Sequence, residues 1–411
     1  MAAMVAEPWP ASKRRAVAEP LSDALRALCS LIAPPGGQAL ALPTADPEQL
    51  ARAARRHQVE SLVVERLTHA NADVPPALAA AARRAREAGL RQLSVAIDLQ
   101  RRFAAVGLGC LFLKGLALSQ RAYGAMLTRQ SVDIDLLIAA TDVPRAWRVL
   151  AEAGYLPLNP QKALSGAALG LFLHSAKDSL HRDPLHGVAI ELHWRMSDEM
   201  AAPALPPPEG WQTVTVSPGV HLETLADADL VVFLCTHGAA HGWARLKWLA
   251  DVAALLASAP DGGAAWWLHA QRAGATIPAA SAVLLAERLL GMAPPPGFDP
   301  PRSLRLSLLM RLAMALIAAG GGTRELATTP WRGWAEMAAK LLAAANWRAR
   351  AVVGRRLLVS AEDVAELSLP AGFGWLYPVL RVPMLVRRRL GRARRRAQRL
   401  HRRGQGPNTA R

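Results

Sequence analysis

Residues 131–138, Ser-Val-Asp-Ile-Asp-Leu-Leu-Ile, place two carboxylates in alternation with aliphatic side chains. On a β-strand, residues two apart project from one face, so Asp133 and Asp135 point together while the aliphatic residues between them turn toward a core. Two adjacent carboxylates repel each other unless protons or cations lie between them. A hard divalent cation is the usual solution, and a solvated strand end is the simpler alternative.

A second segment, residues 188–194 (Val-Ala-Ile-Glu-Leu-His-Trp), presents Glu191 in an equally apolar setting, with His193 two residues further on the same face. Unpaired charge in such a setting is costly. Three acids on neighbouring strands fit a two-metal site, in which the ions stabilise the attacking and leaving oxygens of a phosphoryl or nucleotidyl displacement.

The segments around these acids alternate between strand and helix patterns. Short apolar or alternating runs predict strands, and apolar residues three or four apart predict helices. In chain order we expect strand 108–113, helix 116–123, strand 132–138, helix 141–154 and strands 177–182 and 188–194. The last two flank a loop with the residues of a hairpin connection, so the sheet is predicted to be mixed.

The rest of the chain is predicted to be mostly helical, at 21–32, 46–67, 76–105, 222–257, 264–273, 278–291, 303–319 and 331–350. The predicted fold class is α+β, a small mixed sheet flanked by N-terminal and C-terminal helical regions, with helix dominating overall. Its predicted parts are a disordered N-terminus (1–20), a helical region (21–105), the sheet core (106–202), a Pro-rich linker (203–221), a helical domain (222–350) and an irregular segment with an Arg-rich tail (351–411).

The excess of basic residues is concentrated at the C-terminus. The chain has 49 Lys and Arg against 32 Asp and Glu, a net charge of +17, yet residues 381–411 hold 12 Arg and no acid. The remaining chain therefore carries only +5. Such a tail attracts nucleic acid or an anionic membrane, or it is simply a solvated helix with a frayed end.

The three cysteines, Cys29, Cys110 and Cys235, are far apart, and each lies inside an apolar run. This pattern indicates a reducing compartment and argues against a disulfide framework, a disulfide-linked partner and a Cys-based zinc site. The N-terminus has no apolar core of a signal peptide, and the longest apolar stretches fall short of the roughly 20 residues that span a bilayer. We therefore expect a cytoplasmic protein.

Several motifs in the predicted sheet core resemble a known group of enzymes. They are Leu-Lys-Gly-Leu-Ala-Leu (113–118), Tyr123-Gly124 and Arg-Gln-Ser-Val-Asp-Ile-Asp-Leu-Leu (129–137). Together they resemble the opening of the nucleotidyltransferase superfamily that includes DNA polymerase beta and, more narrowly, a bacterial family of uncharacterised nucleotidyltransferases. That family also shows an acid-Leu-His-Trp strand, here 191–194, and a segment like 237–251. The resemblance covers roughly residues 20 to 260, with a weaker match at Leu376-Tyr377 and Arg381.

The resemblance implies an Mg²⁺-dependent nucleotidyltransferase that transfers a nucleoside monophosphate from an NTP, with ATP favoured, and releases pyrophosphate. Asp133 and Asp135 would bind Mg²⁺, or Mn²⁺, together with the triphosphate. Glu191 would complete the catalytic metal site and take the acceptor's proton. Gly115 would let the phosphates approach the backbone. The superfamily usually has Gly-Gly or Gly-Ser at this turn, closer to the acids, and we expect Lys114 to substitute as a phosphate partner.

Further nucleotide contacts are predicted on either side of the sheet core. Arg129 and Ser131 lie in the loop before the acids, and His241, Arg245 and Lys247 lie in one predicted helix at 237–251 that faces the triphosphate and the base. The alternative is that Trp243, Trp248 and the histidines only pack the helical domain on the sheet. His237 and His241 are spaced like zinc ligands, but the Glu of His-Glu-x-x-His and a third ligand are missing.

The acceptor stays open among a small molecule, a peptide natural product and RNA. One alternative is a toxin-like enzyme that modifies tRNA, for which the Arg-rich tail would be an RNA contact and activity would fall steeply with salt. An alternative of another class is a nucleotide-binding or scaffold protein that has lost catalysis. The intact trio of acids argues against it.

Overall fold

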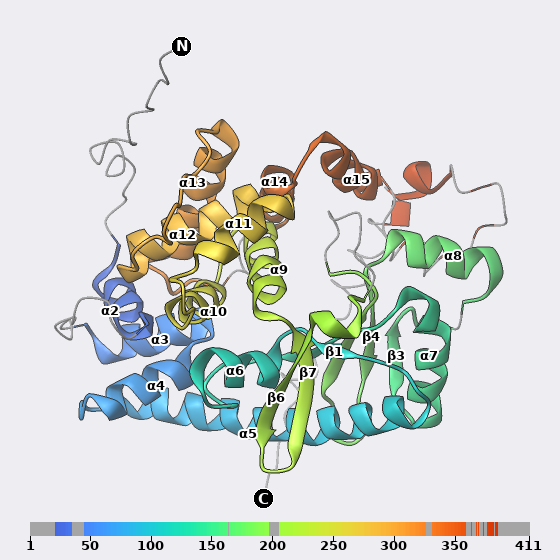
Figure 1. Ribbon diagram of the computed structural model, residues 1–411, viewed down its shortest axis with the longest axis horizontal. Coiled ribbons are helices and arrows are strands. Elements are labelled where there is room, and N and C mark those ends of the chain that lie inside the picture. The colour runs from blue at the N-terminus through green and yellow to red at the C-terminus, as the bar shows by residue number, and fades with distance from the viewer. Residues whose placement is uncertain are drawn as a thin grey trace, which may run out of the picture.

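The computed structural model describes residues 21–34, 45–162, 164–196, 205–325 and 331–358, together with isolated positions and short runs from 363 to 384. Helices dominate, and a mixed sheet of five strands lies among them (Figure 1). The predicted α+β class is confirmed. The predicted disordered N-terminus at 1–20 and the tail beyond 384 lie outside the described residues, and the predicted domain boundaries stay a prediction.

Four helices precede the sheet: α2 (Asp23–Ile32), α3 (Pro47–His57), α4 (Glu60–His69) and α5 (Pro76–Ala105). Side chains cap the first two, since Ser22 accepts from the backbone of Leu25 and Asp46 from that of Glu48. The prediction of one helix over 46–67 is wrong. Gln58 adopts the left-handed conformation at φ 57°, which ends α3 and lets α4 start in a new direction.

The sheet region follows as β1 (Leu111–Phe112), α6 (Gly115–Tyr123), β2 (Asp133–Leu137), the 3₁₀ turn η1 (Ala140–Asp142), α7 (Val143–Glu152), β3 (Leu156–Asn159), α8 (Gly166–Ser175), β4 (Asp178–Arg182) and β5 (Ala189–His193). The spatial order is β1-β2-β5-β4-β3, with β2 and β5 parallel and the other pairs antiparallel. The predicted hairpin of the last two strands is confirmed. Strand β3 and helix α8 are absent from the sequence prediction.

One face of the sheet packs into a hydrophobic core. Ile134 and Leu136 of β2 and Ile190 of β5 are buried there, with Leu99 and Phe103 of α5 among their neighbours. Figure 1 shows α5 running along the lower edge of the molecule beneath the sheet. Because side chains alternate along a strand, the acids of β2 and β5 lie on the opposite face.

An antiparallel hairpin of β6 (Trp211–Ser217) and β7 (Val220–Leu225) follows the 3₁₀ turn η2 (Pro208–Gly210) and packs against β1 and α6. This corrects two predictions, because β6 lies in the predicted linker 203–221 and β7 begins inside it and overlaps the predicted helix 222–257. The run at 213–216, Thr-Val-Thr-Val, has the alternation of a strand. The buried Thr224 hydroxyl donates to the Phe112 carbonyl at 2.7 Å, which fastens the hairpin to β1.

The C-terminal region contains α9 (Asp227–Ala240), α10 (Leu246–Ala257), α11 (Ala264–Arg272), α12 (Thr276–Leu290), α13 (Leu304–Ala318), α14 (Arg332–Ala343) and α15 (Trp347–Leu358). The predicted helices 264–273, 278–291 and 303–319 are confirmed within a few residues. The predicted helix 331–350 is instead two helices, because residues 344–346 are not helical.

The break between α9 and α10 is the most consequential departure from the predicted helix 222–257. Gly242 and Trp243 both have positive φ, at 60° and 50°, which reverses the chain after His241. The Trp243 side chain is fully buried, donates its Nε1–H to the Ser281 hydroxyl at 2.9 Å, and packs so closely on Gly238 that a Cβ there would lie 2.3 Å from the indole. Burial of this one side chain stabilises a backbone that helical periodicity does not predict.

The largest hydrophobic core joins the N-terminal helices α2, α3 and α4 to α9, α10 and α12. All three cysteines are free and buried. Among the described residues, no helix is both long and apolar enough to cross a bilayer.

Candidate active site

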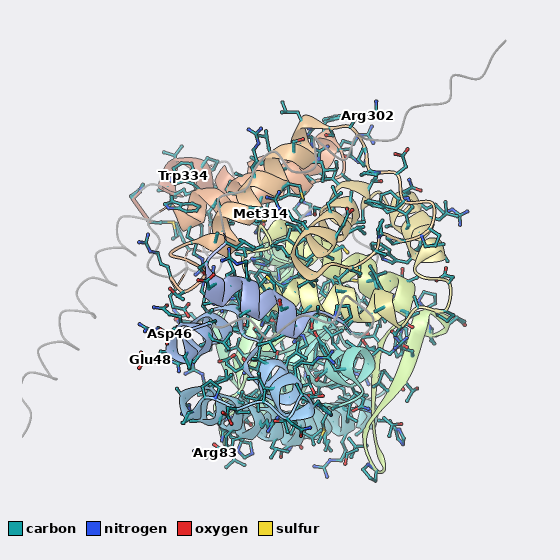
Figure 2. The ribbon with its side chains drawn as sticks, turned by 90° about the vertical axis from the view of Figure 1, so that its left-hand side faces the viewer. Asp46, Glu48, Arg83, Arg302, Met314 and Trp334 are labelled. Carbon is teal, nitrogen blue, oxygen red and sulfur yellow. The ribbon has the colours of Figure 1, made fainter. Side chains whose placement is uncertain are left out.

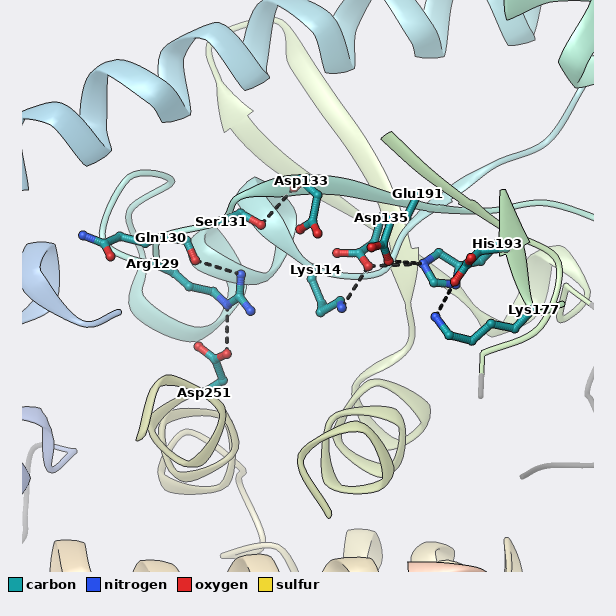
Figure 3. Close-up of polar contacts among 11 residues, drawn as sticks. Lys114, Arg129, Gln130, Ser131, Asp133, Asp135, Lys177, Glu191, His193 and Asp251 are labelled. Atoms are coloured by element: carbon teal, nitrogen blue, oxygen red, sulfur yellow. Dashed lines mark hydrogen bonds and ion pairs between the residues drawn. The ribbon is translucent and has the colours of Figure 1, made fainter. Parts of the chain in front are cut away.

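The parallel pairing of β2 with β5 brings the predicted acids together. Asp135 lies directly opposite Glu191 in the register, and Asp133 lies opposite Ala189. Paired residues in a sheet project from the same face, so the three carboxylates share one surface. Figure 3 shows the Asp133 and Asp135 side chains pointing to the same side of β2, toward Lys114.

Asp135 is buried beside two basic groups. Its Oδ1 lies 2.8 Å from Lys114 Nζ and 3.2 Å from His193 Nε2. Burial acts to raise the pKa of this carboxyl, but Lys114 and His193 hold the pKa well below its usual range. Its other oxygen, Oδ2, is buried and has no hydrogen-bond partner among the described residues. An ionised, unpartnered oxygen in this position suits a metal ligand.

His193 connects the two paired acids. Its Nε2 lies 3.3 Å from Glu191 Oε2 as well as 3.2 Å from Asp135 Oδ1. Burial and Lys177 act to lower the pKa of His193, but the hydrogen bonds to Asp135 and Glu191 outweigh them and raise it. One ligand atom from each of these three residues falls within 4.8 Å of the others, a spacing that can hold a metal ion.

Asp133 sits at the margin of this cluster. Its side chain is partly buried and is not among the three residues whose ligand atoms lie within 4.8 Å of one another. Burial and the charges of Asp135 and Glu191 raise the pKa of Asp133 to about 6. The predicted metal set of Asp133, Asp135 and Glu191 thus shares two members with the close group, and His193 takes the third place in that group.

The turn before α6 brings a cation and a glycine to the acids. Lys114 is the residue before α6 and Gly115 is its first residue, with φ +67°, a conformation that favours glycine. A Cβ on Gly115 would lie 4.0 Å from the Ser131 hydroxyl oxygen, so the turn faces the loop that leads into β2. Ser131 donates its hydroxyl to the backbone carbonyl of Asp133 at 2.9 Å. The structure therefore brings Lys114, Gly115 and Ser131 together, and their contact with a nucleotide stays a prediction.

The Arg129 side chain belongs to a buried network of hydrogen bonds. Its Nε donates to Asp251 Oδ2 at 2.8 Å, and the Tyr123 hydroxyl donates to the other oxygen of Asp251 at 3.0 Å. Arg129 and Asp251 are both buried. The network fastens the loop before β2 to α10, so Arg129 positions that loop (Figure 3).

Lys247, in the first turn of α10, is buried at 8% exposure. Burial and the charges of Arg129 and Lys114 lower the pKa of Lys247 to about 7, and Asp251 and Asp133 act in the opposite direction. No hydrogen bond or ion pair joins its ammonium group to another described residue. A buried ammonium among other cations is costly unless an anion reaches it.

His237, His241 and Trp248 form a partly exposed cluster of rings. The ring centroids of His237 and His241 are 4.7 Å apart, and Trp248 lies 5.5 Å from the first and 5.3 Å from the second. The prediction that they share one helix is wrong, because His241 is the C-cap residue of α9 and Trp248 belongs to α10. The contact comes from the reversal between the helices. Burial, Lys340 and Lys114 lower the pKa of His241 to about 3, which leaves it neutral.

The Arg245 side chain contacts elements other than the sheet. Its guanidinium donates to the Arg56 carbonyl at 2.9 Å and lies 3.9 Å from Glu325. Arg56 is itself buried and donates to the Ala244 and Leu316 carbonyls. Among the described residues, the partners of Arg245 join α3, α10 and the loop after α13, and none is an acid of the sheet. The predicted nucleotide contact of Arg245 lacks support in this geometry.

The model of a family described as uncharacterised nucleotidyltransferase matches residues 43–291. The chain belongs to this family. No curated protein matches it. The match runs from just before α3 to the end of α12 and contains every acid and cation of the site. The protein is therefore a transferase of the nucleotidyltransferase type, with a possible metal-binding triad at Asp135, Glu191 and His193.

Two residues of this nucleotidyltransferase site were missed in the sequence. Asp178 of β4 pairs in register with His193, and its Oδ2 lies 3.7 Å from His193 Nδ1. Lys177 Nζ lies 2.5 Å from the same oxygen of Asp178. The alternation of β4 could have indicated that Asp178 shares a face with the acids, but only the register decides which residue it meets.

Proposed function

We propose that this protein is an Mg²⁺-dependent enzyme that transfers a nucleoside monophosphate from an NTP, with ATP favoured, to an acceptor. The observation that carries the proposal is the in-register pairing of Asp135 with Glu191 around a buried carboxylate oxygen that has no hydrogen-bond partner in the described part of the chain. The two parallel strands hold the carboxylates in fixed positions. In-line displacement at phosphorus requires such fixed positions, because its catalysis is mainly positioning and charge stabilisation.

The donor atoms fit a hard divalent ion. Asp133, Asp135 and Glu191 offer carboxylate oxygens, which Mg²⁺ and Mn²⁺ prefer. When bound, the ion would supply positive charge to the phosphate oxygens. His193 has its Nε2 between Asp135 and Glu191 and orients both carboxylates.

The triphosphate is proposed to lie on the face of the site lined by Lys114, Gly115, Ser131 and Lys247. Lys114 already lies 2.8 Å from Asp135, so a small rotation of its side chain exchanges a carboxylate for a phosphate. Lys247, with a pKa near 7, takes up a proton when an anionic phosphate approaches. Binding of the triphosphate thus makes the positive charge of Lys114 available to a phosphate and leads Lys247 to become protonated.

The nucleobase is proposed to stack on His241 and Trp248. Both rings are partly exposed, and the charge of Lys114 contributes to the low pKa of His241, which supports a base site on the Lys114 side of α9. A neutral imidazole and an indole form a sequence-tolerant surface for a base, worth about 1–3 kcal/mol. In this proposal Arg129 positions the Ser131 loop, and Arg245 stabilises the start of α10.

Glu191 is proposed to accept the acceptor's proton. Its side chain is 32% exposed, whereas that of Asp135 is 1% exposed, so Glu191 is the acid that an incoming hydroxyl reaches. The acceptor oxygen forms a bond to the α-phosphorus, the bond from that phosphorus to the β-phosphate oxygen breaks, and pyrophosphate leaves. The acceptor proton moves to Glu191. Because NTPs are supplied in the cytoplasm, we place the reaction there.

The test is transfer of label from each α-³²P-labelled NTP to fractions of a host extract, with purified protein and Mg²⁺ or Mn²⁺. Small-molecule, peptide and RNA fractions are separated, so the labelled fraction names the acceptor class. We expect transfer, with Asp135→Asn reducing it at least about a thousandfold. Glu152→Gln, at an exposed position on α7, is the matched control and should keep full transfer. Transfer that survives Asp133→Asn with Asp135→Asn would refute the proposed site.

A further inference from the structure

The excess of basic over acidic residues lies in the region after the family match. Residues 301–411 hold 22 of the 49 Lys and Arg and 5 of the 32 Asp and Glu, so this region alone carries the whole net charge of +17. Residues 1–300 are balanced. The family match ends at 291. The excess charge therefore lies outside the segment that matches the nucleotidyltransferase family.

The exposed tryptophans lie in the same region. Trp331, Trp334 and Trp347 are 42%, 81% and 67% exposed, and the other tryptophans among the described residues are buried or partly buried. Leu304 of α13 and Val352 of α15 add exposed aliphatic groups at 75% and 43%. Large apolar side chains exposed together on a monomer mark an interaction surface.

The helices that carry or border these side chains lie along one edge of the molecule. Figure 1 shows α13, α14 and α15 along the upper edge, opposite α5 at the lower edge, and Figure 2 shows Trp334 at the upper periphery. Helix α14 packs on α9 and α13 through a stripe of Ala335, Ala339 and Ala343. Because that stripe faces inward, Trp334 faces solvent.

Basic residues are interleaved with the tryptophans. Arg332 lies between Trp331 and Trp334, and Arg348 is next to Trp347 with its guanidinium carbon 5.5 Å from the indole centroid. Only two acids occur from 301 to 358, Glu325 and Glu336. Glu336 is paired with Arg332 at 2.7 Å.

We infer that the edge formed by α13, α14 and α15 docks on the surface of an anionic lipid bilayer. Indole rings prefer the boundary between headgroups and acyl chains, where one end is apolar and the other wet. Arginines gain about 1 kcal/mol each near an anionic leaflet. Exposed aliphatic groups such as Leu304 gain from burial in the acyl region and nothing from a nucleic-acid backbone, which favours lipid over RNA. The 12 arginines at 381–411 add attraction from the same end of the chain.

The test is flotation of the full-length protein with vesicles of phosphatidylcholine alone or of phosphatidylcholine with 30 mol% phosphatidylglycerol, a composition chosen for the assay in about 0.1 M salt. We expect binding to the anionic vesicles at least about a hundredfold tighter than to the neutral ones. The double variant W334S/W347S should bind the anionic vesicles roughly tenfold more weakly. Both side chains are exposed, so the variant should keep the wild-type circular dichroism and melting temperature.

The matched control is L90S/I97S, which removes two exposed apolar side chains from α5 at the opposite edge. It should bind vesicles like the wild type. Equal binding by W334S/W347S and wild type would overturn the inference, as would failure of the wild type to float with anionic vesicles. Tight binding to a mixed RNA pool without flotation would also overturn it. None of these outcomes depends on nucleotidyl transfer.

Discussion

Replacing Lys247 by Met should change stability and nucleotide binding in opposite directions. Lys247 is 8% exposed, and burial lowers its pKa from 10.5 to about 7. Between these two pH values the unfolded chain binds more protons than the folded one, so this residue makes stability fall as pH falls from 10.5 toward 7. Below about pH 7, Lys247 is protonated in both the folded and the unfolded state, and this residue lowers the stability no further. Methionine has a similar length and no charge to desolvate.

The magnitude follows from the pKa difference. Each pH unit in this window is worth about 1.36 kcal/mol, so going from pH 9 to pH 7 costs the wild type about 2 kcal/mol at this residue, after allowance for half-protonation at pH 7. The Lys247→Met protein should show none of that loss. The charge of Lys247 also lowers the pKa of Asp133, but that pKa of about 6 lies below this pH window, so the difference between the two pH dependences reports mainly on Lys247.

Urea unfolding at pH 7, 8 and 9 measures the stability difference, and calorimetry with ATP and Mg²⁺ measures binding. We expect ATP affinity to fall roughly 10- to 100-fold in Lys247→Met, since a charge-assisted contact to phosphate is lost. Lys162→Met, at an exposed position, is the matched control and should alter neither quantity. If Lys247→Met keeps the wild-type pH dependence, or binds ATP as tightly, the assignment of a buried phosphate-binding ammonium is refuted.

Three further substitutions probe the site and its support. His193→Gln should raise the Mn²⁺ concentration needed for half-maximal transfer by roughly 10- to 100-fold, and an unchanged metal titration would exclude a role in orienting the acids. Gly115→Ala should cost about 1 kcal/mol in urea unfolding because φ is +67°, whereas Gly333→Ala, at an open helical position, should be neutral or stabilising. Asp251→Asn should destabilise the fold by about 3–5 kcal/mol, because the charge of Arg129 is left buried; a smaller loss in the double variant with Arg129→Met would support this cause, and equal losses would contradict it.

Tertiary packing overrode helical periodicity where the two conflict. The run from 222 to 257 is apolar at helical spacing, yet it contains a strand, two helices and a reversal. The reversal depends on Trp243, whose indole is buried against Gly238 and bonded to Ser281. Those partners cannot be identified from local spacing, because the favourable energy comes from side chains of other elements.

The same limit applies to the grouping of polar residues. His193 and Asp135 are 58 residues apart in the chain and 3.2 Å apart in space. Arg245 and Lys247 are two residues apart in the chain. Arg245 donates to the Arg56 carbonyl, whereas the charges of Lys114 and Asp133 act on Lys247. The two side chains have different surroundings because α10 begins between them, at Leu246.

The sequence by itself determined the acids on alternating strand positions, the glycine turn before α6 and the mixed, helix-dominated architecture. Period-two and period-3.6 patterns are local properties, and Asp133, Asp135 and Gly115 lie within them. Only the tertiary structure decided that Asp135 meets Glu191 and His193, that Lys247 is buried, and that the tryptophans of α14 and α15 face solvent. Register, burial and partner choice depend on which surfaces the whole chain brings together, and no single segment encodes them.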